Sequence, residues 1–110
     1  ITSEKMAIGH FFDGKASLVV GTHTHVPTND VRILKSGTAY QTDAGMCGDY
    51  DSVIGMDKEN SMNRFMKKES TKHFPAEGNA TLCGIITKLN PQTGLALSAE
   101  SFIYGGELDN

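Results

Sequence analysis

Two histidines one residue apart are the residues in this sequence best suited to chemistry. They lie in "VVGTHTHVPT", directly after a short apolar run that ends at Gly21. Residues two apart in an extended segment point the same way, because a strand repeats every two residues. If strand geometry continues past Gly21, His23 and His25 aim at one spot. Imidazole binds zinc, iron, manganese and similar ions, so the spacing predicts a metal site at a strand end.

Two histidines alone leave other interpretations open. They can be polar residues in a turn, and a transition-metal site normally takes three or four protein groups. Asp30 can equally form a turn, and Asp43 can be a buried carboxylate bonded to backbone amides. No carboxylate has a spacing that requires coordination. The candidate carboxylates are Asp30, Asp43, Asp49 and Asp51.

Composition and length limit the class of protein. The 110 residues suit one domain or a piece of one, and the chain begins with Ile1, which suggests a processed product or a fragment. The net charge of −3 argues against a nucleic-acid binder with a basic surface, so we expect nucleic acid only as a substrate. No apolar run approaches the roughly 20 residues that span a bilayer. Cys47 and Cys83 lack CxxC spacing and indicate reduced, mostly buried thiols in a cytoplasmic protein.

The first half of the chain predicts a helix, a strand and a hairpin. Residues 2–15 predict a short helix that Thr2 or Ser3 caps and that Asp13-Gly14 stops, with an apolar face of Ile8, Phe11 and Phe12. Residues 16–22 are short, apolar and β-branched, which favours a parallel strand buried on both faces. Residues 31–34 and 38–42 flank a turn that contains Gly37, which predicts a hairpin.

The second half predicts a loop, a helix and a second hairpin. Residues 43–56 are rich in glycine and indicate an ordered loop. Residues 57–68 predict a helix capped by Asp57, with Met62, Phe65 and Met66 as its buried stripe and Lys67-Lys68 at its end. The clearest hairpin joins residues 80–89 and 95–104, and the tail after it is expected to fray. The order of elements predicts a mixed α/β fold, whose first helix and strand could complete a βαβ unit that starts before Ile1.

Four segments, in order, resemble the C-terminal portion of the YmdB-like proteins, which belong to the calcineurin-like metallophosphoesterases. The resemblance implies a four-layer α-β-β-α sandwich, with residues 1–110 as the C-terminal part of a single domain and the N-terminal half absent. It also implies a phosphodiesterase that hydrolyses 2′,3′-cyclic nucleotides with two divalent ions, iron or manganese. The segments are "TSEK", "VVGTHTHVPT", "GTAYQTDAGMCGDYDSVIGM" and "ATLCGIITKLNPQTG".

The resemblance also implies roles for individual residues. His23 and His25 would each bind one metal, whereas the other ligands and the proton donor would lie upstream of this chain. Asp43 would fix a ligand imidazole. The substrate pocket would be shaped by Thr22, Thr24 and the "GDYDS" loop, with Tyr50 available to stack on a base. For these last residues, loop packing or contact between subunits is an equal alternative.

Another hypothesis concerns the chain by itself. It can be a catalytically inactive fragment that acts as a self-associating structural module or as a metal-binding module. A partial sandwich exposes apolar surface on segments such as "SLVVG", and such surface drives association into a homo-oligomer or with the missing half.

Overall fold

The chain divides into two compact units, each built from two stretches of sequence. A computed structural model describes residues 1–66 and 72–109. Unit 1 comprises Ile1–Gly45 and Cys83–Phe102, and unit 2 comprises Met46–Leu82 and Ile103–Asn110. Residues 1–25, which end with the predicted histidine site, therefore all belong to unit 1.

Helix α1 (Thr2–Phe12) opens unit 1, where the sequence predicts a helix. The residue before it is Ile1, without a side-chain cap, so the predicted cap by Thr2 or Ser3 is wrong. Glu4 lies in the first turn, where a negative charge favours the helix dipole. The helix ends at Phe12 because Asp13 adopts an extended backbone.

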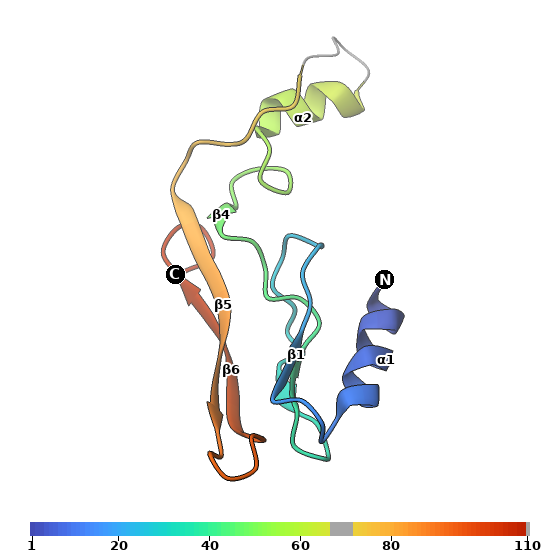
Figure 1. Ribbon diagram of the computed structural model, residues 1–110. Coiled ribbons are helices and arrows are strands. Elements are labelled where there is room, and N and C mark those ends of the chain that lie inside the picture. The colour runs from blue at the N-terminus through green and yellow to red at the C-terminus, as the bar shows by residue number, and fades with distance from the viewer. Residues whose placement is uncertain (67–71, 110) are drawn as a thin grey trace. The chain divides into compact units, whose positions relative to one another are not determined.

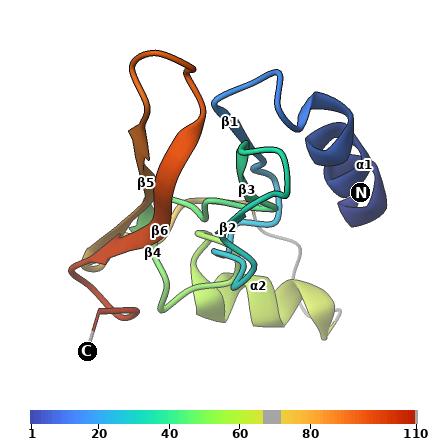
Figure 2. The ribbon, with the colours of Figure 1, turned by 90° about the horizontal axis from the view of Figure 1, so that it is seen from below.

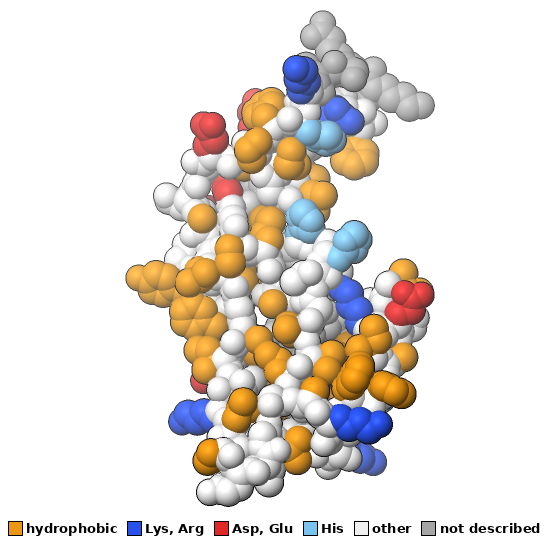
Figure 3. Space-filling view, in the orientation of Figure 1, with side chains coloured by type: hydrophobic (Ala, Val, Ile, Leu, Met, Phe, Trp, Pro, Cys, Tyr) orange, Lys and Arg blue, Asp and Glu red, His pale blue; other side chains and the backbone are white. Residues whose placement is uncertain are grey.

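The buried face of α1 differs from the predicted one. The predicted apolar face is exposed, by 51% at Ile8, 65% at Phe11 and 41% at Phe12. Figure 3 shows hydrophobic side chains gathered on the surface over this helix. The buried residue is instead Gly9, where a Cβ atom would lie 2.6 Å from Cδ1 of Tyr40. Periodicity identified which residues share a face of the helix. The face that packs against Tyr40 is instead the one that carries Gly9, because glycine has no side chain to keep the two apart.

The first sheet has the strand order β1-β3-β2. Strand β1 (Leu18–Val20) pairs in parallel with β3 (Ala39–Gln41), as predicted for residues 16–22. Strand β1 is half-buried to exposed, so the prediction that it is buried on both faces is wrong. Strand β3 is fully buried and forms the centre of the unit. Helix α1 lies beside β1 in both views (Figures 1 and 2).

The first predicted hairpin is confirmed, and it joins an edge strand of the first sheet to the central strand β3. Strand β2 (Arg32–Ile33) pairs antiparallel with β3, with Arg32 opposite Tyr40. The Leu34 amide donates to the Thr38 carbonyl at 2.8 Å, which closes the turn. Gly37 has φ +106°, a conformation that glycine adopts without a Cβ penalty.

The second sheet has the order β4-β5-β6 and contains the predicted C-terminal hairpin. Strands β5 (Ala80–Leu89) and β6 (Ala96–Tyr104) flank a turn in which the Asn90 side chain accepts a hydrogen bond from the Gln92 amide at 2.8 Å. Strand β4 (Gly48–Asp49) pairs antiparallel with β5. The predicted loop of residues 43–56 therefore contains a short strand.

Helix α2 (Lys58–Phe65) follows its predicted cap. The Asp57 carboxylate accepts a hydrogen bond from the Asn60 amide at 2.9 Å. The predicted buried stripe is wrong, because Met62, Phe65 and Met66 are 48%, 80% and 57% exposed. The helix buries Asn60 and Ser61 instead. The predicted basic end, Lys67-Lys68, lies outside the described residues.

Three further expectations can be compared with the structure. Cys83 is buried as expected, but Cys47 is exposed, and neither thiol is in a disulfide. In the tail, the Asp109 carboxylate accepts a hydrogen bond from the Gly105 amide at 2.7 Å, and fraying of the tail stays a prediction. Within residues 1–66 and 72–109, no helix is both long and apolar enough to cross a bilayer.

Candidate functional site

The two histidines lie in a tight loop and not in a continued strand. Strand β1 ends at Val20, and the backbone then turns. His23 has φ +110° and His25 has φ +68°, which is the left-handed region. The expectation that strand geometry persists past Gly21, and with it the period-two reason for a shared direction, is therefore wrong. Left-handed backbone costs free energy at a residue with a Cβ atom, so other contacts must hold this loop.

Thr24, between the two histidines, is held by the buried carboxylate of Asp43. The Asp43 side chain accepts hydrogen bonds from the Thr24 amide at 2.7 Å and from the Thr24 hydroxyl at 2.8 Å, both on Oδ2. Its Oδ1 atom accepts a hydrogen bond from the Gly45 amide at 2.8 Å. Asp43 is fully buried at the end of β3. The carboxylate therefore positions both histidines through the residue that joins them.

Lys5 of helix α1 holds the same loop from the other side. Its ammonium donates to the Thr22 carbonyl at 2.5 Å and to Oδ2 of Asp43 at 3.5 Å. The Lys5 side chain is 21% exposed and that of Asp43 is 1% exposed, so the pair is shielded from water. Sequence reasoning missed Lys5, because a lysine in the first turns of a helix is ordinarily a solvated residue. The "TSEK" segment was the part of the sequence that could have drawn attention to it.

Gly21 brings the start of the loop close to β3. Its amide donates to the Gln41 carbonyl at 3.1 Å, and its carbonyl accepts a hydrogen bond from the Ala44 amide at 2.9 Å. A Cβ atom at this position would lie 2.1 Å from the Thr42 carbonyl oxygen. Only glycine allows this approach, which fixes where the histidine loop leaves the sheet.

Asp43 remains a carboxylate at ordinary pH. Burial raises its pKa, but the hydrogen bonds from Thr24 and Gly45 and the charge of Lys5 together lower it further than burial raises it. The net pKa is therefore below the ordinary value of 3.8. An ionised carboxylate is a stronger acceptor than a neutral one, which favours the rigid loop.

The other three candidate carboxylates hold the backbone or a cation. Asp30 accepts hydrogen bonds from the hydroxyls of Thr28 and Thr42. Burial raises its pKa, and the bonds from Thr42 and Thr28 lower it by more. Asp49 accepts a hydrogen bond from the Gly78 amide at 2.9 Å, and Asp51 pairs with Lys58 at 2.8 Å. These contacts support the interpretation of these residues as structural.

A cavity of about 470 Å³ opens beside the histidine loop and the start of helix α1. Thr22, His23 and Thr24 are exposed and His25 is half-buried, so the loop can reach a ligand from solvent. The residues around the cavity offer an ammonium, an imidazole and hydroxyls. They are Ile1, Thr2, Lys5, His23 and Thr24.

The donor set of the loop fits part of a metal site. Two accessible imidazoles are suitable ligands for iron or manganese. No group of three or more histidine, cysteine, aspartate or glutamate side chains that could hold a metal ion forms among residues 1–66 and 72–109.

Tyr50 belongs to unit 2, whereas the histidine loop and Asp43 belong to unit 1. The Tyr50 hydroxyl donates to the Met46 carbonyl and accepts from the Met46 amide, both at 2.9 Å. These bonds close the loop locally and favour the packing interpretation of this residue.

Comparison with known proteins identifies relatives along most of the chain. The sequence profile of a family described as "YmdB-like protein" matches residues 1–102. A 2′,3′-cyclic-nucleotide 2′-phosphodiesterase of Bacillus subtilis is 49% identical over 106 residues, which cover 96% of this chain and 40% of the relative. A putative phosphatase/phosphodiesterase of Mycoplasma genitalium is 39% identical over 100 residues, which cover 90% of this chain and 36% of the relative.

Two crystal structures are similar in fold as well as in sequence. A hypothetical protein from Thermus thermophilus gives a TM-score of 0.87 at 39% identity, covering 97% of this chain and 42% of that protein. A novel phosphatase from Mycoplasma pneumoniae gives a TM-score of 0.87 at 37% identity, covering 96% of this chain and 38% of that protein. The chain thus spans about two fifths of the length of the relatives it matches.

Proposed function

Because the chain belongs to the YmdB-like family, we propose that it forms part of a metal-dependent phosphodiesterase that hydrolyses 2′,3′-cyclic nucleotides. The name of the Bacillus subtilis relative supports the substrate class, and that of the Mycoplasma pneumoniae structure supports phosphoester hydrolysis. In this proposal, the mixed α/β fold with its two small sheets belongs to one four-layer α-β-β-α domain. Thiols without a disulfide favour the cytoplasm.

The geometry of the histidine loop is the observation that carries this proposal. Two histidines occupy left-handed backbone, which is rare for residues with a Cβ atom. A fully buried carboxylate and a shielded ammonium hold the segment that joins them. Strain that is maintained by such contacts is typical of functional sites.

We assign His23 and His25 as ligands of two divalent ions, iron or manganese. When bound, such ions supply positive charge that stabilises the phosphate oxygens during hydrolysis. Asp43 and Lys5 keep the imidazoles in place through Thr24 and Thr22. Thr22 is exposed on the same loop and can contact the substrate, whereas the Thr24 hydroxyl donates to Asp43. The isolated residues 1–110 would be inactive, since the described residues provide no third ligand.

The test uses the full-length protein that contains this chain. With added manganese, we expect hydrolysis of bis-p-nitrophenyl phosphate and of 2′,3′-cAMP. The His23→Ala variant should lose about 100-fold in kcat/KM and bind less manganese. The matched control is His10→Ala, an exposed histidine on helix α1 that should keep full activity. Full activity of His23→Ala would refute the assignment.

A further inference from the structure

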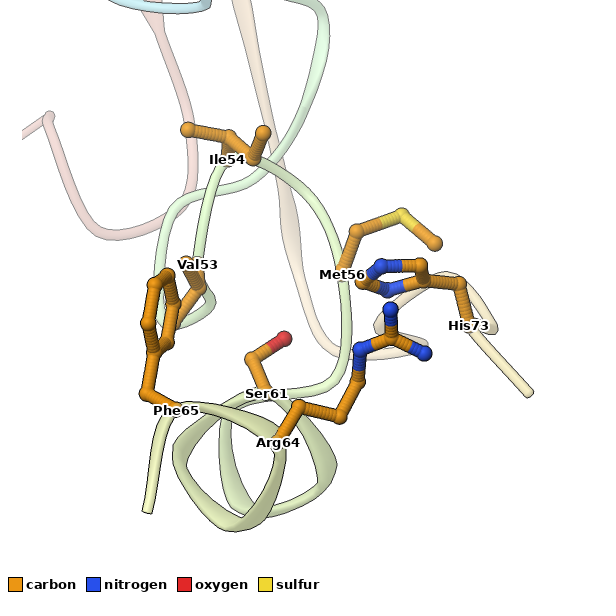
Figure 4. A pocket seen from close by; sticks show the side chains of 7 residues that line it. All are labelled: Val53, Ile54, Met56, Ser61, Arg64, Phe65 and His73. Atoms are coloured by element: carbon orange, nitrogen blue, oxygen red, sulfur yellow. The ribbon is translucent and has the colours of Figure 1, made fainter. Parts of the chain in front are cut away.

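A pocket of about 370 Å³ in unit 2 has no part in the proposed function. It lies between helix α2, the turn before this helix and the segment around His73. Figure 4 shows the side chains that these three segments contribute. The side chains that matter for its chemistry are Val53, Ser61, Arg64, Phe65 and His73.

The first wall of this pocket is a strained tight turn. The Val53 amide donates to the Met56 carbonyl at 3.0 Å, and the Met56 amide donates to the Val53 carbonyl at 2.9 Å. Ile54 and Gly55 between them have φ values of +49° and +94°, as in a type I′ turn. A β-branched residue strongly disfavours that backbone, yet Ile54 occupies it and lines the pocket.

The opposite wall is fixed by backbone hydrogen bonds. The Ala76 amide donates to the Gly55 carbonyl at 2.8 Å, and the Asp57 amide donates to the Phe74 carbonyl at 3.0 Å. The Asn60 side chain donates to the Lys72 carbonyl at 3.0 Å. These bonds hold the segment that carries His73 against the turn and the helix, so the pocket is preformed.

Ser61 provides an independent indication of a ligand. The residue is 3% exposed, and its hydroxyl has no hydrogen-bond partner among the described residues. Figure 4 shows this hydroxyl pointing from helix α2 into the pocket. A buried hydroxyl without a partner costs free energy, and most such groups in proteins are satisfied. A polar group of a bound molecule would satisfy this one.

The side chains divide the pocket into an apolar side and a side that carries an arginine and a histidine. In Figure 4, Phe65 and Val53 lie on one side, Arg64 and His73 on the other, and Ser61 between them. A guanidinium binds phosphate through paired hydrogen bonds, and an aromatic ring stacks on a flat base. We propose that this pocket binds a nucleoside monophosphate, with the phosphate on Arg64, the base on Phe65 and a ribose hydroxyl on Ser61. This second site goes beyond the proposed function, because it uses none of the residues of the histidine loop.

Calorimetric titration of the full-length protein, in a buffer that contains EDTA, tests the proposal. Chelation removes divalent ions, so a metal-dependent site in unit 1 contributes no binding. We expect 5′-AMP to bind with one site per chain and at least tenfold more tightly than adenosine or inorganic phosphate. Arg64→Gln should weaken 5′-AMP binding about tenfold, which corresponds to the loss of a charged hydrogen bond. Phe65→Ala should weaken it several-fold.

Matched control variants on helix α2 distinguish a loss of binding in the pocket from a general effect of substitution on the helix. Lys58→Gln removes a cation and Met62→Ala removes an apolar side chain, both outside the pocket lining, and both should leave binding unchanged. His23→Ala should also leave it unchanged, which distinguishes this site from the proposed metal site. Phe65 is 80% exposed, so its replacement should not unfold the chain, and far-UV circular dichroism of every variant checks this. No binding of 5′-AMP at millimolar concentration, or equal losses in the control variants, would overturn the proposal.

Discussion

Asp43 is the side chain on which the histidine loop most depends. Its carboxylate accepts hydrogen bonds from the amide and the hydroxyl of Thr24 and from the amide of Gly45. It also pairs with Lys5 away from water. The sequence allowed the interpretation of Asp43 as a buried carboxylate that is bonded to backbone amides. It could not predict that one of its partners is Thr24, between the two histidines, because this contact depends on how β3 and the histidine loop lie in the folded chain.

Asp43→Asn should lower the free energy of unfolding by about 2 kcal/mol at neutral pH, because a charged acceptor in a shielded site is lost. The wild-type pKa of Asp43 is below 3.8, so its contribution is fully present above that value and is lost as the pH falls through the lower folded pKa. The difference between wild type and variant should therefore narrow below about pH 4. Urea unfolding at several pH values measures this.

Asp51→Asn is the control for that series. Asp51 pairs with Lys58 on the surface, with side chains 56% and 49% exposed. An exposed pair of this kind contributes about 0–1 kcal/mol, so the variant should differ little from wild type at any pH. A loss as large as that of Asp43→Asn would contradict the special role of the buried carboxylate.

His25→Gly and His25→Ala should separate backbone strain from imidazole chemistry. Both variants remove the imidazole, so both should lose hydrolytic activity in the full-length protein. Glycine adopts φ +68° without a Cβ penalty, whereas alanine keeps the strain. His25→Gly should therefore be about 1 kcal/mol more stable than His25→Ala. Thermal unfolding compares the two, and equal stability would show that the loop is not strained at this residue.

At the scale of elements, the hairpins could be predicted and the helix faces could not. Gly37 and Asn90 mark turns whose local chemistry is sufficient, and both hairpins are confirmed. Periodicity showed that Ile8, Phe11 and Phe12 share one face of a helix, but not that anything covers it. Likewise, a left-handed backbone is expected at glycine or asparagine, so at His23 and His25 it depends on tertiary contacts that no local pattern contains.

Gly9→Ala should destabilise the chain by about 1 kcal/mol, although alanine is the better helix former by a similar amount. The added Cβ atom would lie 2.6 Å from Cδ1 of Tyr40. The Tyr40 ring is 1% exposed and its hydroxyl is hydrogen-bonded to Thr42 at 3.0 Å, so it has little freedom to move. Chemical denaturation of the variant measures the change.

His10→Ala is the matched substitution for Gly9→Ala, on the exposed side of the same helix. Here an exposed side chain is shortened, and the change in stability should stay within about 0.5 kcal/mol. If Gly9→Ala proved as stable as this control, the close packing of helix α1 on Tyr40 would be wrong.

At the scale of the whole molecule, the balance of buried and exposed apolar residues is unusual. Among the described residues, few apolar side chains are buried, and many large ones are exposed on both helices and on β6. Exposed apolar surface of this kind is typical of surfaces that associate with other chains. Sequence composition alone could not show this, since the overall apolar content of 38% is ordinary. The buried apolar residues are Leu34, Ala39, Tyr40 and Cys83.

Residues 1–110 in isolation should therefore self-associate. Sedimentation velocity should show species that grow as the concentration rises from micromolar to millimolar. The double substitution of Ile8 and Phe11 by serine should shift the distribution toward monomer, because it removes apolar surface from helix α1. His10→Ser, on the same helix, should have no such effect. A clean monomer at every concentration would contradict this expectation.

The single ammonium group of Lys5 joins helix α1 to the histidine loop, through Thr22 and Asp43. An amine engaged in this way reacts slowly with acylating reagents while the loop stays closed, whereas Lys35, which is exposed, reacts freely. Acylation would also remove the charge and so uncouple the two segments. The rate of Lys5 labelling relative to Lys35, followed by mass spectrometry, thus reports how often the loop opens, without a substrate or a metal.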